Sequence, residues 1–175
     1  MAPLSLLRCQ GGTVVLPDER LVLCDRLDGG NLIINPPREV WDRSELNAEE
    51  LTLWTFLVAS TGRAMLDVLP QLAGGCINYW DAGNWALNEQ ADPVGPKNGR
   101  QHRKVHLHLI GRSRNAKSPA MKWGEAPSFP PFAERFQWAA GNHRLTTEEC
   151  DAITTRAGQL MADRYGVRTN GFRER

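Results

Sequence analysis

The sequence predicts one α+β domain over residues 1–175, with an antiparallel sheet of about five strands, one long helix and a C-terminal helix. Three observations predict it. Strand-like and helix-like stretches follow each other as strands, helix, strands, helix, without the alternation of βαβ units. Apolar residues recur at helical spacing between residues 47 and 69. Apolar and polar residues alternate strictly around residue 106, as in a strand with two different faces.

The first 46 residues are expected to be rich in strands. The stretch TVVLPDERLVLC, residues 13–24, has two apolar bursts around Pro17–Arg20, which is the pattern of a hairpin. The stretch NLIIN, residues 31–35, predicts a short buried strand that Pro36 and Pro37 end.

Both helices have start signals in the sequence. Asn47 and Glu50 have the spacing of a capping box, and Pro70 ends the long helix after residue 69. Thr146 and Glu149 have the same spacing at the start of the C-terminal helix, which ends near Gly166. Residues 113–144 are rich in proline and carry little periodicity, as in segments that line a site or an interface.

Charge and composition exclude several classes of protein. Lys and Arg total 21 against 20 Asp and Glu, so the net charge predicts neither a nucleic acid nor a membrane partner. No apolar run is long enough to span a membrane, and the first residues do not resemble a signal peptide, so the expected location is the cytoplasm. Four scattered cysteines without a CxxC pair predict free thiols.

The most informative stretch is HRKVHLHLIGR, residues 102–112, which holds three of the four histidines. Alternation places Val105, Leu107 and Leu109 in the core. The opposite face then carries the following residues: His102, Lys104, His106, His108 and Ile110.

Three interpretations of this face were weighed. It can be a plain polar face. It can be a zinc site built on His106 and His108, but Lys104 on the same face would repel a divalent cation. It can be an anion site in which Lys104, His108, Arg112 and Arg114 gather around phosphate oxygens while a neutral His106 attacks phosphorus. The third interpretation explains the lysine as well as the histidines.

The motif Lys104-Val105-His106-Leu107-His108-Leu109-Ile110 resembles that of the histidine triad family of nucleotide hydrolases and transferases, with lysine in place of the first histidine. The stretch from Gly30 to Pro36 and the stretch WALNEQ, residues 85–90, are similar to two further elements of the family. The resemblance covers roughly residues 20–112, and residues 113–175 form a C-terminal extension. With this extension, the chain resembles bacterial members of the family that are of the diadenosine tetraphosphate hydrolase type.

The resemblance implies a role for each matching residue. His106 corresponds to the nucleophile that forms a nucleotidyl-histidine, and His108 to the histidine on the phosphate oxygens. The substrate-binding positions it implies are Asp25 on the ribose, Asn88 and Gln101 on the phosphate, and Gly99 in the turn before the strand. Lys104 keeps the backbone carbonyl that orients the nucleophile's ring in the family.

The resemblance further implies a nucleotide substrate and a two-fold homodimer, and aromatic residues between 123 and 138 are candidates for its interface. No cofactor is required by the residues, and a Mg²⁺ ion carried by the substrate is compatible with them. Two rival functions remain open. One is a nucleotide-binding protein without catalysis, and the other is a zinc-dependent hydrolase that uses His106 and His108.

Overall fold

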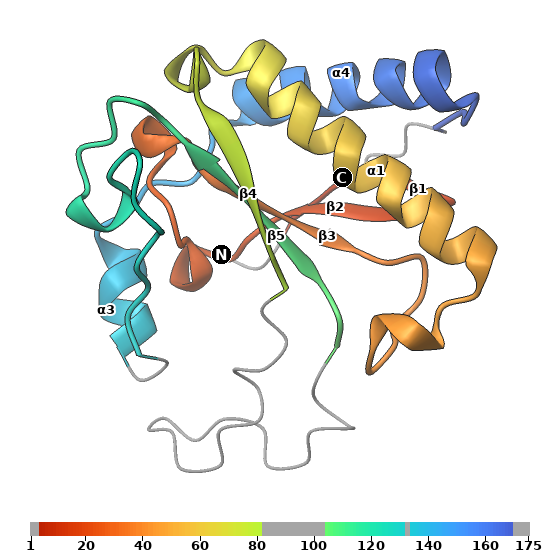
Figure 1. Ribbon diagram of the computed structural model, residues 1–175, viewed down its shortest axis with the longest axis horizontal. Coiled ribbons are helices and arrows are strands. Elements are labelled where there is room, and N and C mark those ends of the chain that lie inside the picture. Colours follow the sequence, from red (N-terminus) through yellow and green to blue (C-terminus); the bar gives the residue numbers. More distant parts are fainter. Residues whose placement is uncertain (1–3, 82–103, 132–133, 170–175) are drawn as a thin grey trace.

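The computed structural model describes residues 4–81, 104–131 and 134–169. Five strands form one open sheet with the order β1-β2-β3-β5-β4, and every neighbouring pair is antiparallel (Figure 1). The strands are β1 (Leu4–Cys9), β2 (Gly12–Leu16), β3 (Asn31–Asn35), β4 (Cys76–Asp81) and β5 (Leu107–Arg112). The expected antiparallel α+β architecture with about five strands is therefore confirmed. β5, which carries the histidines, lies between β3 and the edge strand β4.

The described residues include three α-helices beside the sheet: α1 (Ala48–Val68), α3 (Arg135–Ala140) and α4 (Thr147–Tyr165). Both predicted capping boxes are present with both of their hydrogen bonds, at Asn47 and at Thr146. α1 ends before Pro70 and α4 ends at Gly166, which has the left-handed conformation that favours glycine there. The helix boundaries predicted from local signals are thus confirmed.

One face of the sheet packs against α1 and α4, and this is where the main core lies (Figure 1). Alternate residues of the strands point into it, among them Val14, Ile34, Leu107 and Leu109. The two helices also contact each other through the parallel rings of Phe56 and Tyr165, whose centroids lie 4.1 Å apart. The prediction that Leu107 and Leu109 face the core is confirmed.

The opposite face is covered in part by residues from the C-terminal extension. A smaller apolar cluster forms there around Cys24, Ile110 and Met121, with Phe129 and Trp138 packed against it. Phe129 and Trp138 were candidates for a dimer interface. In the structure they pack within one chain, and their part in a dimer interface stays a prediction.

The predicted hairpin over residues 13–24 is wrong. β2 pairs with β1, through a turn at Gln10 and Gly11, and residues 17–30 contain two short 3₁₀ turns instead of a strand. In the second apolar burst, Val22, Leu23 and Cys24 are buried without strand pairing, while Leu21 is exposed. The side chains of Asn142 and Trp138 donate hydrogen bonds to the carbonyls of Val22 and Leu23. Residues over a hundred positions away therefore satisfy backbone groups that a neighbouring strand would otherwise pair.

All four cysteines are free, as predicted, with Cys24 and Cys150 buried. Burial raises the pKa of the Cys24 thiol to about 12, which makes it a poor nucleophile. Within the described ranges, no helix combines the length and the apolar composition needed to cross a bilayer.

Candidate active site

His106 lies just before β5, and its ring is held by the backbone. Nδ1 of His106 is 2.8 Å from the carbonyl oxygen of Lys104. A carbonyl oxygen only accepts hydrogen bonds, so Nδ1 carries the proton and donates it. The neutral ring then has its lone pair on Nε2, which is the form that a nucleophile requires. The ring is half-buried.

His108 follows on the same face of β5 and is buried. Its ring lies edge-on to that of His106, with centroids 5.0 Å apart. Burial, and after it the charge of His106, lowers the pKa of His108 to about 3. His108 is therefore neutral at physiological pH and has one N–H to donate. Its Nδ1 is buried without a hydrogen-bond partner in the described part of the chain.

Lys104 contributes its backbone to the site, while its side chain pairs elsewhere. Its Nζ lies 3.0 Å from Oε2 of Glu39, in an ion pair whose members are both largely exposed. Such a pair adds little stability, so the ammonium can leave it at small cost. The expected carbonyl contact of Lys104 is present, and the contact of its ammonium with phosphate stays a prediction.

Two aromatic residues that sequence reasoning did not assign to this site lie next to His108 or behind its neighbour. Trp80 of β4 is paired with His108 across the sheet, and the ring centroids lie 5.7 Å apart. Phe129, from the extension, stacks on Trp80 with a centroid distance of 4.6 Å and an interplanar angle of 1°. The register of β4 could have indicated Trp80, but no local signal places residue 129 there.

Arg112 is bound by groups of the extension and of β4, and its expected contact with phosphate stays a prediction. Its guanidinium is buried and donates to the carbonyls of Met121 (3.3 Å), Lys122 (2.8 Å) and Glu125 (2.9 Å), and to Oδ1 of Asn78 (2.7 Å). Four hydrogen bonds hold its two terminal nitrogens, while its Nε is buried without a partner among the described residues. Arg112 therefore fastens the extension to the end of β5.

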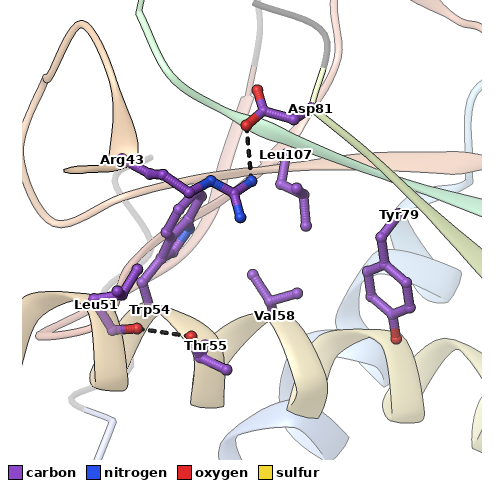
Figure 2. Close-up of a pocket in the computed structure, with 8 residues that line it drawn as sticks. All are labelled: Arg43, Leu51, Trp54, Thr55, Val58, Tyr79, Asp81 and Leu107. Carbon is purple, nitrogen blue, oxygen red and sulfur yellow. Dashed lines mark hydrogen bonds and ion pairs between the residues drawn. The ribbon is translucent and has the colours of Figure 1, made fainter. Parts of the chain in front are cut away.

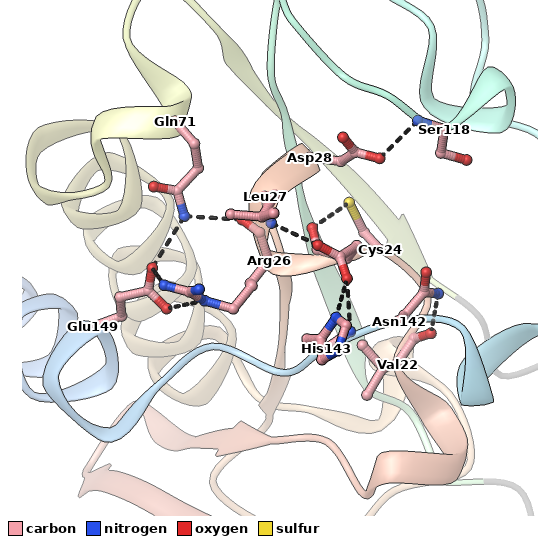
Figure 3. A network of polar contacts seen from close by, with 11 residues as sticks. Val22, Cys24, Arg26, Leu27, Asp28, Gln71, Ser118, Asn142, His143 and Glu149 are labelled. Atoms are coloured by element: carbon pink, nitrogen blue, oxygen red, sulfur yellow. Dashed lines mark hydrogen bonds and ion pairs between the residues drawn. The ribbon is translucent and has the colours of Figure 1, made fainter.

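Asp25 has structural partners in the fold, and its expected contact with a ribose stays a prediction. Its carboxylate accepts the backbone N–H of Leu27 (2.8 Å) and both the backbone N–H (2.8 Å) and Nδ1 of His143 (2.9 Å). Burial alone would raise the pKa of Asp25, but these donors outweigh it and hold the pKa below its usual value. Next to it, Arg26 and Gln71 both bind Glu149, so the whole network joins this loop to the start of α4 (Figure 3).

Four residues of the expected site lie outside the described residues: Asn88, Gly99, Gln101 and His102. Among the residues that the structure does describe, no group of three or more His, Cys, Asp or Glu side chains is placed to hold a metal ion. His106 and His108 thus form a pair with aromatic and aliphatic neighbours across the sheet.

A separate pocket of about 350 Å³ lies on the helix face of the sheet, between α1 and β4. Figure 2 shows Arg43 above the indole of Trp54, with its guanidinium directed to Asp81 at 2.7 Å, and Tyr79 at the other end. The pocket is lined by Arg43, Leu51, Trp54, Thr55, Val58, Tyr79, Asp81 and Leu107. Neither His106 nor His108 is among them, so this pocket and the histidine pair are separate features.

Comparison with known proteins identifies the fold. No family model and no curated protein matches the sequence. Among solved structures, a histidine triad protein from Marinobacter aquaeolei VT8 superposes with a TM-score of 0.52, at 19% identity, over 91% of each chain. The chain therefore has the fold of a histidine triad protein, as its motif implies, and the likeness extends into the C-terminal extension.

Proposed function

We propose that the chain is a nucleotide hydrolase or nucleotidyl transferase in which His106 attacks the α-phosphorus of a nucleoside phosphate. The observation that carries the proposal is the hydrogen bond from Nδ1 of His106 to the carbonyl of Lys104, because it leaves the Nε2 lone pair free. The fold supports the proposal, since the superposed protein is named for a histidine triad. A substrate of the diadenosine tetraphosphate kind is the finer part of the proposal.

The reaction has two displacements at phosphorus. In the first, Nε2 of His106 forms a bond to the α-phosphorus while the bond from phosphorus to the leaving oxygen breaks. The leaving nucleotide departs with the electron pair of that bond. In the second, water attacks the same phosphorus, the bond to His106 breaks, and a nucleoside monophosphate is released.

His108 assists from the neighbouring position on β5. Its lowered pKa keeps the ring neutral, so it donates one hydrogen bond to a phosphoryl oxygen without adding a charge that would repel protonated groups nearby. The Lys104 ammonium, released from Glu39, and the amides of Asn88 and Gln101 complete the contacts with phosphate in this proposal. A Mg²⁺ ion that arrives with the substrate is compatible with them.

The nucleoside is proposed to lie over the middle of the sheet. Val15, Ile33 and His108 are paired across β2, β3 and β5, so their side chains share one face. Ile33 is half-buried and directly opposite His108. A purine packed on this aliphatic row would have its phosphate next to the histidines.

Intact-protein mass spectrometry tests the proposal. The protein is mixed briefly with diadenosine tetraphosphate and quenched without acid, because a phosphorus–nitrogen bond to histidine is acid-labile. We expect a transient gain of one adenylyl group that His106→Ala abolishes. His143→Ala, which removes a histidine with an exposed ring, is the control and should still form the adduct.

The same experiment separates the rivals. Binding of adenosine nucleotides without any adduct or AMP would replace catalysis with a binding-only function. AMP release without an adduct would replace the covalent route with direct attack by water. Zinc that copurifies in stoichiometric amount, and is lost from His106→Ala, would favour the metal-dependent hydrolase.

A further inference from the structure

The two histidines of β5 are oriented by different means. The ring of His106 is fixed by a hydrogen bond to a backbone carbonyl. The ring of His108 lacks such a bond at Nδ1, which is buried and unpaired among the described residues. Most buried polar side-chain atoms have a partner, so this exception requires another account of what holds the ring. Packing is the remaining means.

Among the described residues, the neighbours of His108 across the sheet are aliphatic and aromatic. Across the sheet, its two register partners are Ile33 on β3 and Trp80 on β4. The titratable group that acts on it is His106, its neighbour on the same face. Trp80 in turn lies flat against Phe129. A stack of two parallel rings thus stands behind His108 on the β4 side.

The segment that carries Phe129 is held by three sets of hydrogen bonds: to Asp28 of a 3₁₀ turn, to Arg112 of β5, and within the segment itself. The buried carboxylate of Asp28 accepts the backbone N–H groups of Lys117 (2.6 Å) and Ser118 (3.0 Å). Arg112 binds the three carbonyls between residues 121 and 125. The backbone N–H of Ser128 donates to the carbonyl of Ala120 (2.9 Å), immediately before Phe129. This construction keeps one ring in a defined place.

We propose that Phe129 is a positioning residue that acts through Trp80, holding the ring of His108 in one orientation and keeping water away from its Nδ1. The structural part of this inference stands on the contacts alone. Its consequence for turnover rests on the proposed function, because only there does His108 contact a phosphoryl oxygen. His108, which is proposed to contact the phosphate, is on β5, whereas Phe129, which orients its ring, is in the extension.

The test is an NMR titration of the His108 ring, from about pH 5 to 8, in which histidines usually titrate. In the wild type we expect no titration of His108 in this range, because burial favours the neutral ring. In Phe129→Ala, water should reach Nδ1, and the His108 resonances should shift and titrate. Phe129→Tyr keeps a flat ring and should restore the wild-type behaviour.

Phe136→Ala is the matched control, since Phe136 is an exposed aromatic of the same extension that contacts Arg20 and Arg135. It should leave His108 unchanged. The proposal is overturned if His108 in folded Phe129→Ala behaves as in the wild type, or if Phe136→Ala perturbs it equally. If Phe129→Ala does not fold, Phe129→Leu is judged by the same criterion, because leucine fills space without stacking.

Kinetics provide a second readout. Phe129→Ala should lower kcat at least tenfold with little change in KM, and should move the acid limb of the kcat profile to higher pH. If Phe129→Ala, Phe129→Tyr and Phe136→Ala all changed kcat and KM to the same extent, the cause would be a general loss of structure. That result would contradict the positioning role. If the wild type has no turnover, the proposed function fails while the NMR titration still decides whether Phe129 positions His108.

Discussion

At the scale of single residues, the candidate site separates what a backbone atom does from what a side chain does. Position 104 serves His106 through its carbonyl oxygen, which any amino acid supplies. The lysine side chain at that position is paired with Glu39 at the surface. A lysine is therefore compatible with a position where the resembling family has histidine, because the orienting contact belongs to the backbone.

A substitution at position 104 should show this separation. We expect Lys104→Met to lower kcat/KM by less than about tenfold, because the carbonyl that orients His106 remains. His106→Ala should lower it by at least about a thousandfold, as loss of a nucleophile does. Glu39→Gln, which releases the lysine without removing it, is the control. Steady-state kinetics measure all three. A loss in Lys104→Met as large as that in His106→Ala would instead place the ammonium on the reacting phosphate.

His108 links the site to the stability of the fold. Its pKa is about 3 in the folded chain and about 6.5 when unfolded, because burial disfavours the charged ring. Above about pH 6.5 the ring is neutral in both states and stability is unaffected. Below that pH only the unfolded state binds the proton, so the free energy of unfolding falls by up to about 1.4 kcal/mol per pH unit until about pH 3.

Replacement of this histidine should therefore flatten the acid side of the stability profile. Urea denaturation at several values between pH 7.5 and 4.5 compares wild type with His108→Leu, and the variant should gain stability relative to wild type as the pH falls. His143→Leu removes an exposed ring and should show no comparable gain. Parallel profiles for wild type and His108→Leu would mean that His108 is hydrated in the folded protein.

Among the helices and strands, those were predicted correctly whose determining residues lie close together in the sequence. α1 and α4 begin at capping boxes whose partners are three residues apart, so a short stretch of sequence contains the whole cause. The false hairpin had the opposite origin. The burst at residues 21–24 is apolar because the extension packs against it. Asn142 donates to the carbonyl of Val22, and Trp138 donates to that of Leu23.

The same reasoning applies to the candidate site. Adjacent sequence revealed His106 and His108, because alternation alone places them on one face. Arg112 was expected at the phosphate, because no local pattern indicates that it binds three backbone carbonyls from residues 121–125. The absence of a local pattern is also why the sequence did not assign Phe129 to this site. Contacts made by an irregular segment have no period from which they can be inferred.

The attachment of the extension to β5 can be tested at Arg112. Arg112→Met keeps an unbranched apolar stem and removes every donor, so three carbonyls and Asn78 lose their partner. We expect a loss of about 2–4 kcal/mol in the free energy of unfolding, and faster proteolysis between residues 113 and 131. Lys122→Met is the control, because the Lys122 side chain is exposed and pairs only with its neighbour Glu125 in the described contacts. Equal protease resistance in Arg112→Met and wild type would contradict the attachment.

At the scale of the whole molecule, the sheet ends in an open edge. β4 is the last strand, and in the described part of the chain it pairs only with β5. Tyr79 on this strand is 51% exposed, and Leu51 on the adjoining face of α1 is 38% exposed. The pocket of about 350 Å³ lies between them. Exposed strand edges with apolar neighbours are usually covered, and a second copy does so with two-fold symmetry.

We therefore propose that the homodimer implied by the family resemblance forms along β4 and α1. Light scattering after size exclusion should give the mass of two 19.6 kDa chains for the wild type. Tyr79→Lys places a charge on the edge and should give the mass of one chain. Leu27→Lys changes a residue of equal exposure (52%) in a 3₁₀ turn away from β4, and should remain dimeric. A monomeric wild type would reject the dimer. A dimeric Tyr79→Lys would move the interface off this edge, and the pocket between α1 and β4 would then need another occupant.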